Sequence, residues 1–323
     1  MKPISLPVLL AAACAAPPGK APDSRPAAPW PPPPGPLRII VDTDAANEID
    51  DQYALSLLLG FPERFRLEGL VAAHFGRHGG PEGIERSFRE IHEVLRRASM
   101  EGKVRVCRGL PPLDRPDWPR TRDGVDFILE RARAGTPADP LWLVLLGPVT
   151  DAVAVLREDP SIADRLVVFW HSRSSWPKAC TNFNARNDHP AARAVFETPC
   201  RLILFDTGTH LCAAMEETAR RLAPRGPLGA YLHEIRSRKP DFMTDRKGFF
   251  DLGDAAALAD PSCARFERVQ APSVREDLSY DFSRRNGEVV RLFDVSRDRC
   301  FDLLEEALRK IAESARNPRD GSP

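Results

Sequence analysis

The sequence predicts an α/β protein with a Rossmann-like, mainly parallel sheet that helices cover on both faces. Short apolar, β-branched segments alternate along the chain with segments of helical periodicity. The apolar segments have no polar face, as expected of strands that are buried on both sides of a parallel sheet. The length of 323 residues, with 42% hydrophobic and 28% charged residues, suits one large globular domain.

The elements follow one another in a regular order. Strands are predicted at residues 38–43, 67–73, 103–107, 141–147, 165–170 and 201–206. Helices are predicted at residues 50–59, 85–98, 150–158, 190–197, 214–223 and 300–315, several of them with an apolar stripe on one face. No P-loop or GxGxxG motif follows any of these strands, which weakens an interpretation as a nucleotide-phosphate site.

Residues 1–16 are typical of a secretory signal peptide. Lys2 precedes an apolar stretch that is too short to span a bilayer. The run LLAAAC, which ends at Cys14, is similar to a bacterial lipoprotein signal. We therefore expect an exported protein, either periplasmic or an outer-membrane lipoprotein that is lipidated at Cys14. The alternative is an ordinary cleaved signal in which Cys14 is incidental.

Residues 17–36 form a Pro-rich segment, since twelve of the 32 prolines precede residue 37. We expect an extended linker that holds a folded domain, residues 37–316, away from a membrane or wall. A disordered tail is expected at residues 317–323. The formal net charge is zero and no basic stripe is present, so we expect no nucleic acid partner and no membrane contact except through a lipid anchor. No cysteines form a CxxC pair, so no zinc site is expected.

An acidic cluster follows the first predicted strand. Five carboxylates fall within ten positions: Asp42, Asp44, Glu48, Asp50 and Asp51. In a parallel sheet, ligands bind beyond the carboxyl ends of the strands. Like charges this close raise one another's pKa, and a hard cation such as Ca²⁺, which prefers several oxygen ligands, would offset the repulsion. Asp50 and Asp51 would also suit the first turn of a helix, but that alternative does not explain all five acids.

Four segments in this order resemble the inosine–uridine-type nucleoside hydrolases. They are IIVDTDAANEIDDQYAL (39–55), LLGPVTDAVAVL (145–156), NFNARNDHPAARAVFET (182–198) and FFDLGDAAALADPS (249–262). Together they span most of residues 38–300. The NEIDD sequence is also similar to a divergent, exported branch of nucleoside-hydrolase-like proteins. The resemblance implies a Rossmann-like hydrolase of N-ribosyl bonds in nucleosides or ribosides, with one bound Ca²⁺; it leaves homo-oligomers open.

The resemblance also assigns roles to individual residues. Asp44 matches the general base and a metal ligand. Asp51 and the backbone carbonyl of Leu146 match further metal ligands, and Asp50 matches a partner of the ribose hydroxyls. Asp42 would lie beneath these ligands, or would only be solvated at the end of the strand.

The last metal ligand is Asp251 or Asp254. The family places this acid nine residues before the Asp of an Asp-Pro pair. Counting back from Asp260 selects Asp251 and puts Phe250 where part of the family has a histidine. Phe250 cannot donate a proton to a leaving group, so we expect better activity on ribosides with good leaving groups.

The substrate-binding positions depart from the family pattern. Asn184 matches an asparagine that binds the sugar, whereas Asn182 stands where the family has a glutamate. Five residues separate Asp44 from Asp50 where the family usually has three, and the extra length carries Asn47 and Glu48, which we expect to contact substrate.

The loop HFGRHGG, residues 74–80, replaces a Gly-Asn pair of the family. We expect His74 to contact substrate, with Arg77 and His78 as alternatives. A histidine on a loop is also often merely solvated.

Three functions remain open from the sequence. The first is an exported, Ca²⁺-dependent hydrolase of N-ribosyl bonds. The second is a non-catalytic, Ca²⁺-dependent carbohydrate-binding protein on a lipoprotein stalk, and the third is an interaction domain on such a stalk. The retained Asp44 favours the enzyme, because a protein that only binds sugar needs no general base.

Overall fold

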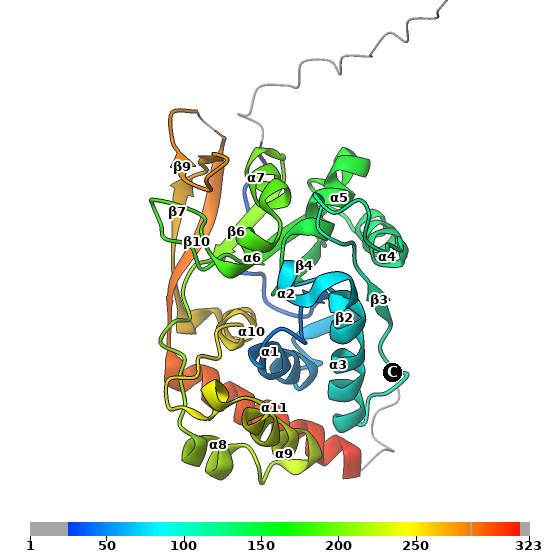
Figure 1. Ribbon diagram of the computed structural model, residues 1–323, viewed down its shortest axis with the longest axis vertical. Coiled ribbons are helices and arrows are strands. Elements are labelled where there is room, and N and C mark those ends of the chain that lie inside the picture. Colours follow the sequence, from blue (N-terminus) through cyan, green and yellow to red (C-terminus); the bar gives the residue numbers. More distant parts are fainter. Residues whose placement is uncertain (1–24, 285, 317–323) are drawn as a thin grey trace, which may run out of the picture.

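The computed structural model describes residues 25–284 and 286–316, which form an eight-stranded sheet between two layers of helices (Figure 1). The strand order is β3 (Val106–Arg108), β2 (Phe65–Ala72), β1 (Leu37–Thr43), β4 (Leu141–Leu145), β5 (Leu166–His171), β6 (Arg201–Phe205), β10 (Glu288–Val295) and β7 (Ala264–Gln270). All neighbouring strands pair in parallel except β10 and β7, which are antiparallel. A small antiparallel pair, β8 (Ser273–Val274) and β9 (Tyr280–Asp281), lies apart from this sheet.

The predicted fold class is confirmed, and so are the six predicted strands, with shifts at their ends. Sequence reasoning missed β7 and β10. β7 carries Arg265, Glu267 and Arg268 and is largely exposed, as is common for an edge strand. Because charged residues interrupt the apolar residues of β7, this strand lacks the continuous apolar run by which the other strands were predicted.

The helices form one layer on each face of the sheet. One layer contains α1 (Asp50–Leu59), α3 (Gly83–Arg97), α9 (Gly226–Glu234), α10 (Leu252–Ala259) and α11 (Arg297–Arg316). The other contains α4 (Asp123–Arg133), α5 (Thr150–Glu158) and α7 (His189–Glu197). Shorter helices lie in loops: α2 (Gly76–Gly79), α6 (Phe183–Asn187) and α8 (Met215–Arg221). The six predicted helices are confirmed as α1, α3, α5, α7, α8 and α11.

The topology creates a cleft at the carboxyl ends of β1 and β4. From β1 the chain moves to β2 and β3 on one side, and then returns to β4 on the other side of β1. The Leu146 N–H donates to the Asp42 carbonyl at 2.8 Å, so the segments that leave β1 and β4 stay paired. Ligand sites of open α/β sheets lie at such a reversal of strand order. The acidic cluster after β1 therefore lies where a site is expected.

The described part of the Pro-rich segment packs against the domain, which corrects the expectation of a free linker for residues 25–36. Trp30 is 5% exposed, and its ring centroid lies 5.9 Å from that of Phe169 and 6.4 Å from that of Phe266. The Arg25 guanidinium donates to the carbonyls of Val195, at 3.2 Å, and Phe196, at 2.6 Å. Extended, proline-rich backbone builds no core of its own. Here the aromatic side chain of Trp30 holds the segment against the core of the domain.

The predicted signal peptide with Cys14, residues 17–24 of the predicted linker and the predicted tail 317–323 lie outside the described residues. Within the described part of the chain, no helix is both long enough and apolar enough to cross a membrane.

Candidate active site

The acidic turn between β1 and α1 lines a cavity of about 190 Å³ at the carboxyl end of the sheet. The Asn47 N–H donates to the Asp44 carbonyl at 2.8 Å, which closes the turn. Asp44 is 2% exposed, and its Oδ2 has no hydrogen-bond partner among the described residues. A side chain at Gly147 would place its Cβ 3.1 Å from Asp44 Oδ1, so the glycine of the GPVT segment gives this carboxylate its space.

The carboxylates of the cavity are held in a setting that disfavours their charge. Burial, and then the neighbouring carboxylates Asp51 and Asp50, raise the pKa of Asp44 well above its usual range. Burial, and then Asp50, raise the pKa of Asp51 to about 7, although its carboxylate accepts a hydrogen bond from the Thr43 hydroxyl. Burial and the same acids raise the pKa of Asp251. Positive charge nearby would stabilise the ionised form of these carboxylates, and the neighbouring side chains supply only part of it.

The residues present fit a divalent cation. Carboxylate oxygens of Asp50, Asp51 and Asp251 lie within 4.8 Å of one another. Leu146 also lines the cavity, and its carbonyl accepts a hydrogen bond from Asn184 Nδ2 at 2.7 Å, which leaves a second lone pair. Buried carboxylate and carbonyl oxygens are the donors that a hard cation prefers. The free Asp44 Oδ2 adds a further oxygen to this set.

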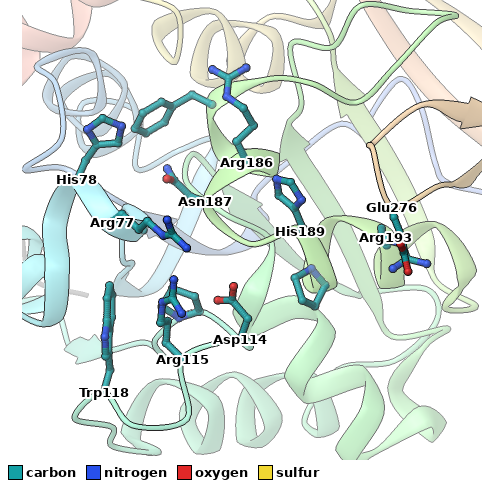
Figure 2. A pocket seen from close by; sticks show the side chains of 14 residues that line it. Arg77, His78, Asp114, Arg115, Trp118, Arg186, Asn187, His189, Arg193 and Glu276 are labelled. Carbon is teal, nitrogen blue, oxygen red and sulfur yellow. The ribbon is translucent and has the colours of Figure 1, made fainter.

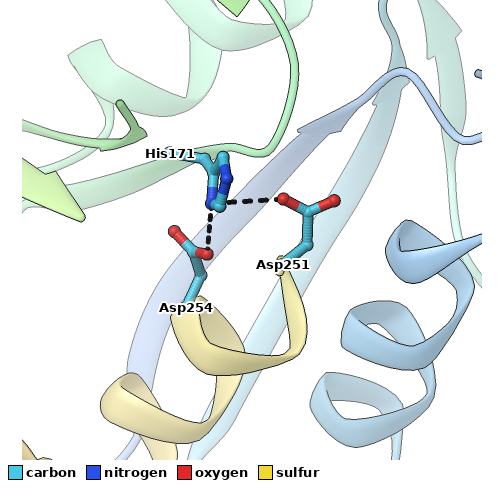
Figure 3. A group of neighbouring side chains, drawn as sticks. All are labelled: His171, Asp251 and Asp254. Atoms are coloured by element: carbon cyan, nitrogen blue, oxygen red, sulfur yellow. Dashed lines mark hydrogen bonds and ion pairs between the residues drawn. The ribbon is translucent and has the colours of Figure 1, made fainter. Parts of the chain in front are cut away.

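Asp251, directly before α10, and Asp254, in the first turn of α10, occupy different positions (Figure 3). Asp251 lines the cavity with Asp50 and Asp51, whereas Asp254 is fully buried behind it. His171 Nδ1 lies 2.7 Å from Asp254 Oδ2 and 3.2 Å from Asp251 Oδ1. Asp251 is therefore the acid that faces the cavity, and Asp254 is placed to hold His171.

The other predicted contacts also meet at the cavity, which is lined by Asn47, Glu48, Asp50, Asn182 and Asn184. Asn184 Nδ2 donates to the carbonyls of Leu146 and His171, so it ties the ends of β4 and β5 together. Asn182 caps α6 through its Oδ1, and its buried Nδ2 has no partner among the described residues. That free amide is available to a substrate hydroxyl.

The structure does not place His74 in this cavity, which corrects its predicted substrate contact. His74 is 2% exposed and is not among the lining residues. Its Nε2 lies 2.8 Å from the Thr150 hydroxyl, and its Nδ1 accepts from the Gly76 N–H at 3.1 Å. Burial lowers the pKa of His74 to about 3, so the ring is neutral and serves to join β2 to α5.

Sequence reasoning missed three cationic or titratable side chains of the site: His171, Arg173 and Lys247. His171 is the last residue of β5, one position past the predicted strand, and the rule that sites follow strand ends is the signal that would have found it. The Arg173 guanidinium lies over the Phe250 ring at 3.8 Å, and its Nη1 is buried with no partner among the described residues.

Lys247 approaches from the loop before α10. Its Nζ lies 2.5 Å from Glu48 Oε2 and 3.9 Å from Asp50 Oδ1. Burial by itself would lower its pKa, but Asp50 and Glu48 outweigh burial, and the net shift is upward. Lys247 thus stays charged and offsets part of the acidic cluster. Nothing local in the sequence marks it, because it is about 200 residues from its partners.

The fold and the site define an α/β protein with a carboxylate-lined cleft suited to a hard cation. The family model of the inosine-uridine preferring nucleoside hydrolases matches residues 39–290. The chain belongs to this family, and it is a hydrolase that acts on N-glycosyl bonds.

Solved structures agree with the fold. A plant nucleoside hydrolase is 19% identical, with a TM-score of 0.66, and the match covers 86% of this chain and 99% of that one. An inosine-uridine preferring nucleoside hydrolase from Bacillus anthracis is 16% identical, with a TM-score of 0.64 and coverage of 85% and 99%. The type III effector protein XopQ, solved with adenosine diphosphate ribose, is 18% identical, with a TM-score of 0.63 and coverage of 87% and 95%. No curated protein matches the sequence.

Proposed function

We propose that the protein is a Ca²⁺-dependent hydrolase of N-ribosyl bonds in nucleosides or ribosides. The observation that carries the proposal is the buried Asp44, whose free oxygen shares a cavity with Asp50, Asp51 and Asp251. The family membership supports hydrolysis of an N-glycosyl bond. The oxygen-only donor set supports Ca²⁺, since softer metals prefer nitrogen or sulfur ligands.

Asp44, Asp51, Asp251 and the Leu146 carbonyl would hold the cation. Such a cation, when bound, grips vicinal hydroxyls of a sugar and favours the ionised form of a nearby acid. Asp44 would then take a proton from the water that adds its oxygen to the anomeric carbon. The bond to the leaving group breaks through an oxocarbenium-like transition state, and its electron pair departs with the leaving group. Asp50 and the free Asn182 Nδ2 are placed to orient sugar hydroxyls.

We also propose that the protein is exported and carries a lipid at Cys14. The charged and apolar pattern of residues 1–16 supports export, and the LLAAAC run supports lipidation. Metabolic labelling of the full chain with a radioactive fatty acid, compared with Cys14→Ser, tests this step. Label retained by Cys14→Ser, or no label in either chain, contradicts lipidation at Cys14.

One assay tests the hydrolase. The purified protein is incubated with a panel of nucleosides and nitrophenyl riboside, with Ca²⁺ or with a chelator. Release of base or nitrophenol that the chelator abolishes and added Ca²⁺ restores supports the proposal. Saturable binding of sugar without turnover would instead support the carbohydrate-binding alternative, and turnover that persists in chelator would contradict the metal dependence.

A further inference from the structure

Figure 2 shows a second and larger cavity, of about 710 Å³. Phe183 and Arg186 of α6 line both cavities, so the two cavities are neighbours. The walls come from α2, α6, the start of α7 and the loop that follows β3. The side chains that matter for binding are the guanidinium groups of Arg77, Arg115, Arg186 and Arg193 and the rings of Trp118 and Phe183.

Four arginines line this cavity, and none of them forms an ion pair with a carboxylate in the described part of the chain. Arg186 and Arg193 donate only to backbone carbonyls, those of Thr181 and Val274. Arginines elsewhere in the molecule are commonly paired. The guanidinium of Arg38, for example, lies 2.7 Å from Glu68, and that of Arg291 lies 2.6 Å from Asp206.

The charge of the cavity is therefore positive. Asp114 and Glu276 are its carboxylates, against four guanidinium groups. Figure 2 shows Arg77 and Arg115, which line this cavity together with Asn187 and His189. The Asn187 Nδ2 is buried and has no hydrogen-bond partner among the described residues. The four guanidinium groups, two of which are exposed to solvent, and the buried amide N–H of Asn187 are all donors, so the cavity suits an acceptor that carries negative charge.

We propose that this second cavity, lined by Arg77, Arg115, Arg186 and Arg193, binds a phosphate-bearing part of the ligand whose ribosyl part occupies the acidic cavity. Guanidinium groups match phosphate oxygens in pairs, and Trp118 and Phe183 offer flat faces beside them. The phosphate is bound by side chains here, which is why no glycine-rich phosphate motif is needed in the sequence.

The inference rests on the proposed function only for the position of the ribosyl part. It changes the expected substrate class from neutral nucleosides to anionic, phosphate-bearing ribosides. The phosphate can belong to the ribose itself or can lie further along the ligand. Adenosine 5′-monophosphate, adenosine diphosphate and pyrophosphate separate these two cases when each is compared with adenosine.

The test is calorimetric titration of the full chain with these four compounds in the presence of Ca²⁺. We expect the phosphorylated compounds to bind at least about tenfold more tightly than adenosine. The preference should shrink when salt rises from about 50 mM to about 300 mM, because screening weakens contacts between exposed charges. The double variant Arg77→Ala/Arg115→Ala should bring the affinity for the monophosphate to within about threefold of that for adenosine.

Arg309→Ala is the matched control. Arg309 is an exposed arginine of α11 whose guanidinium lies 3.0 Å from Glu313, and it lines neither cavity. It should keep the preference for phosphate, and retained melting temperatures would show that each variant is folded. Equal affinity for adenosine and its phosphates, or an undiminished preference in the double variant, overturns the inference.

Binding and turnover separate the two proposals. Nucleoside hydrolysis with no phosphate preference in titration leaves the proposed function standing and overturns only the second cavity. A preference for phosphate without hydrolysis of any riboside supports phosphate binding in the second cavity and overturns the proposed hydrolase function. Binding of pyrophosphate alone, with no gain for the monophosphate over adenosine, would separate the two cavities and overturn the single-ligand arrangement.

Discussion

Buried carboxylates dominate this protein at the scale of single residues. Asp44, Asp50, Asp51 and Asp251 are each at most 5% exposed, and they share one small cavity. Isolated buried charges are strongly disfavoured, so this arrangement carries a cost that a structural role does not explain. A cation and a reacting water explain both the number of acids and their closeness.

Asp44→Asn is expected to lower turnover by about 10²–10⁴-fold, because the amide cannot accept a proton as a general base. The measurement is kcat/KM on the best substrate of the panel, and Asp126→Asn serves as the control. Asp126 is an exposed acid of α4, and its carboxylate lies 2.9 Å from Arg122. Near-native turnover of folded Asp44→Asn would show that this residue is not the base.

Asp251→Asn is expected to weaken Ca²⁺ binding more than Asp254→Asn does. Asp251 lines the cavity, whereas Asp254 contacts His171 and would act on the site through that contact, for which the usual loss is roughly 10–100-fold. Calorimetric titration of both variants with Ca²⁺ decides the order. If Asp254→Asn abolishes binding while Asp251→Asn barely changes it, the two assignments must be exchanged.

The leaving group is expected to depart without strong acid catalysis. Phe250 lines the cavity where a proton donor would be useful, and it cannot donate. Burial, and then Arg173, lower the pKa of His171 to about 3, so its ring is neutral near pH 7 and a poor donor. We therefore expect kcat/KM for nitrophenyl riboside to exceed that for inosine by about 10²-fold or more. Equal values would point to another donor.

At the scale of elements, the site exists because α1 and α10 pack against each other next to the switch point of the sheet. α1 begins with Asp50 and Asp51, and α10 follows directly after Asp251. The Phe250 N–H donates to Asp50 Oδ2 at 3.2 Å, which connects the starts of the two helices. Two helix starts that meet in this way place acids where backbone N–H groups stabilise negative charge.

Trp30→Ala is expected to lower the free energy of unfolding by about 3–5 kcal/mol, the usual range for a buried aromatic side chain that is removed. Trp30 packs on Phe169 of β5 and Phe266 of β7 and so fastens residues 25–36 to the sheet. Denaturant unfolding measures the change. Trp118→Ala is the control, since Trp118 is only partly buried and should cost less. A loss no larger than that of the control would contradict the packed arrangement.

Over the whole molecule, a net charge of zero hides a separation of charge. An acidic cavity and a cavity lined by four arginines, none of which forms an ion pair within residues 25–284 and 286–316, lie side by side at the carboxyl end of the sheet. A ligand that offers hydroxyls to one and phosphate to the other would match both. The overall balance keeps the molecule free of a strong field of one sign.

The metal-free protein is expected to lose stability as the pH rises from about 6.5 to about 8. The pKa of Asp51 rises from 3.8 in the unfolded chain to about 7 in the folded one, and Asp44 and Asp251 shift in the same direction. The folded state therefore binds more protons in this window, so the free energy of unfolding falls as the pH rises. Below about pH 6.5, His171 and His74 act in the opposite direction, because their pKa values are lowered.

Thermal unfolding in chelator, at both ends of this window, measures the effect. Ca²⁺ should raise the melting temperature more at about pH 8 than at about pH 6.5, since ligands must be ionised to bind it. Asp51→Asn should flatten the pH dependence of the metal-free protein. A melting temperature in chelator that rises across the window would contradict the assignment of these buried acids.

The sequence by itself determined the parallel sheet, the six apolar strands and the position of the acidic turn after β1. These features are local: a strand buried on both faces needs an uninterrupted apolar run, and the acids of the turn are neighbours in the chain. The resemblance added Leu146, Asn184 and the choice of Asp251, all of which line the cavity.

Only the tertiary structure decided which distant side chains complete the site and which do not. His171 and Arg173, at the end of β5, and Lys247, from the loop before α10, reach the acids from distant parts of the chain, while the His74 side chain forms a buried contact with Thr150. The strand β7 and the packing of Trp30 against the sheet also became evident only from the tertiary structure. The physical reason is that hydrophobic periodicity records which face of an element is buried, whereas contacts between elements depend on sheet order and loop paths that periodicity does not encode.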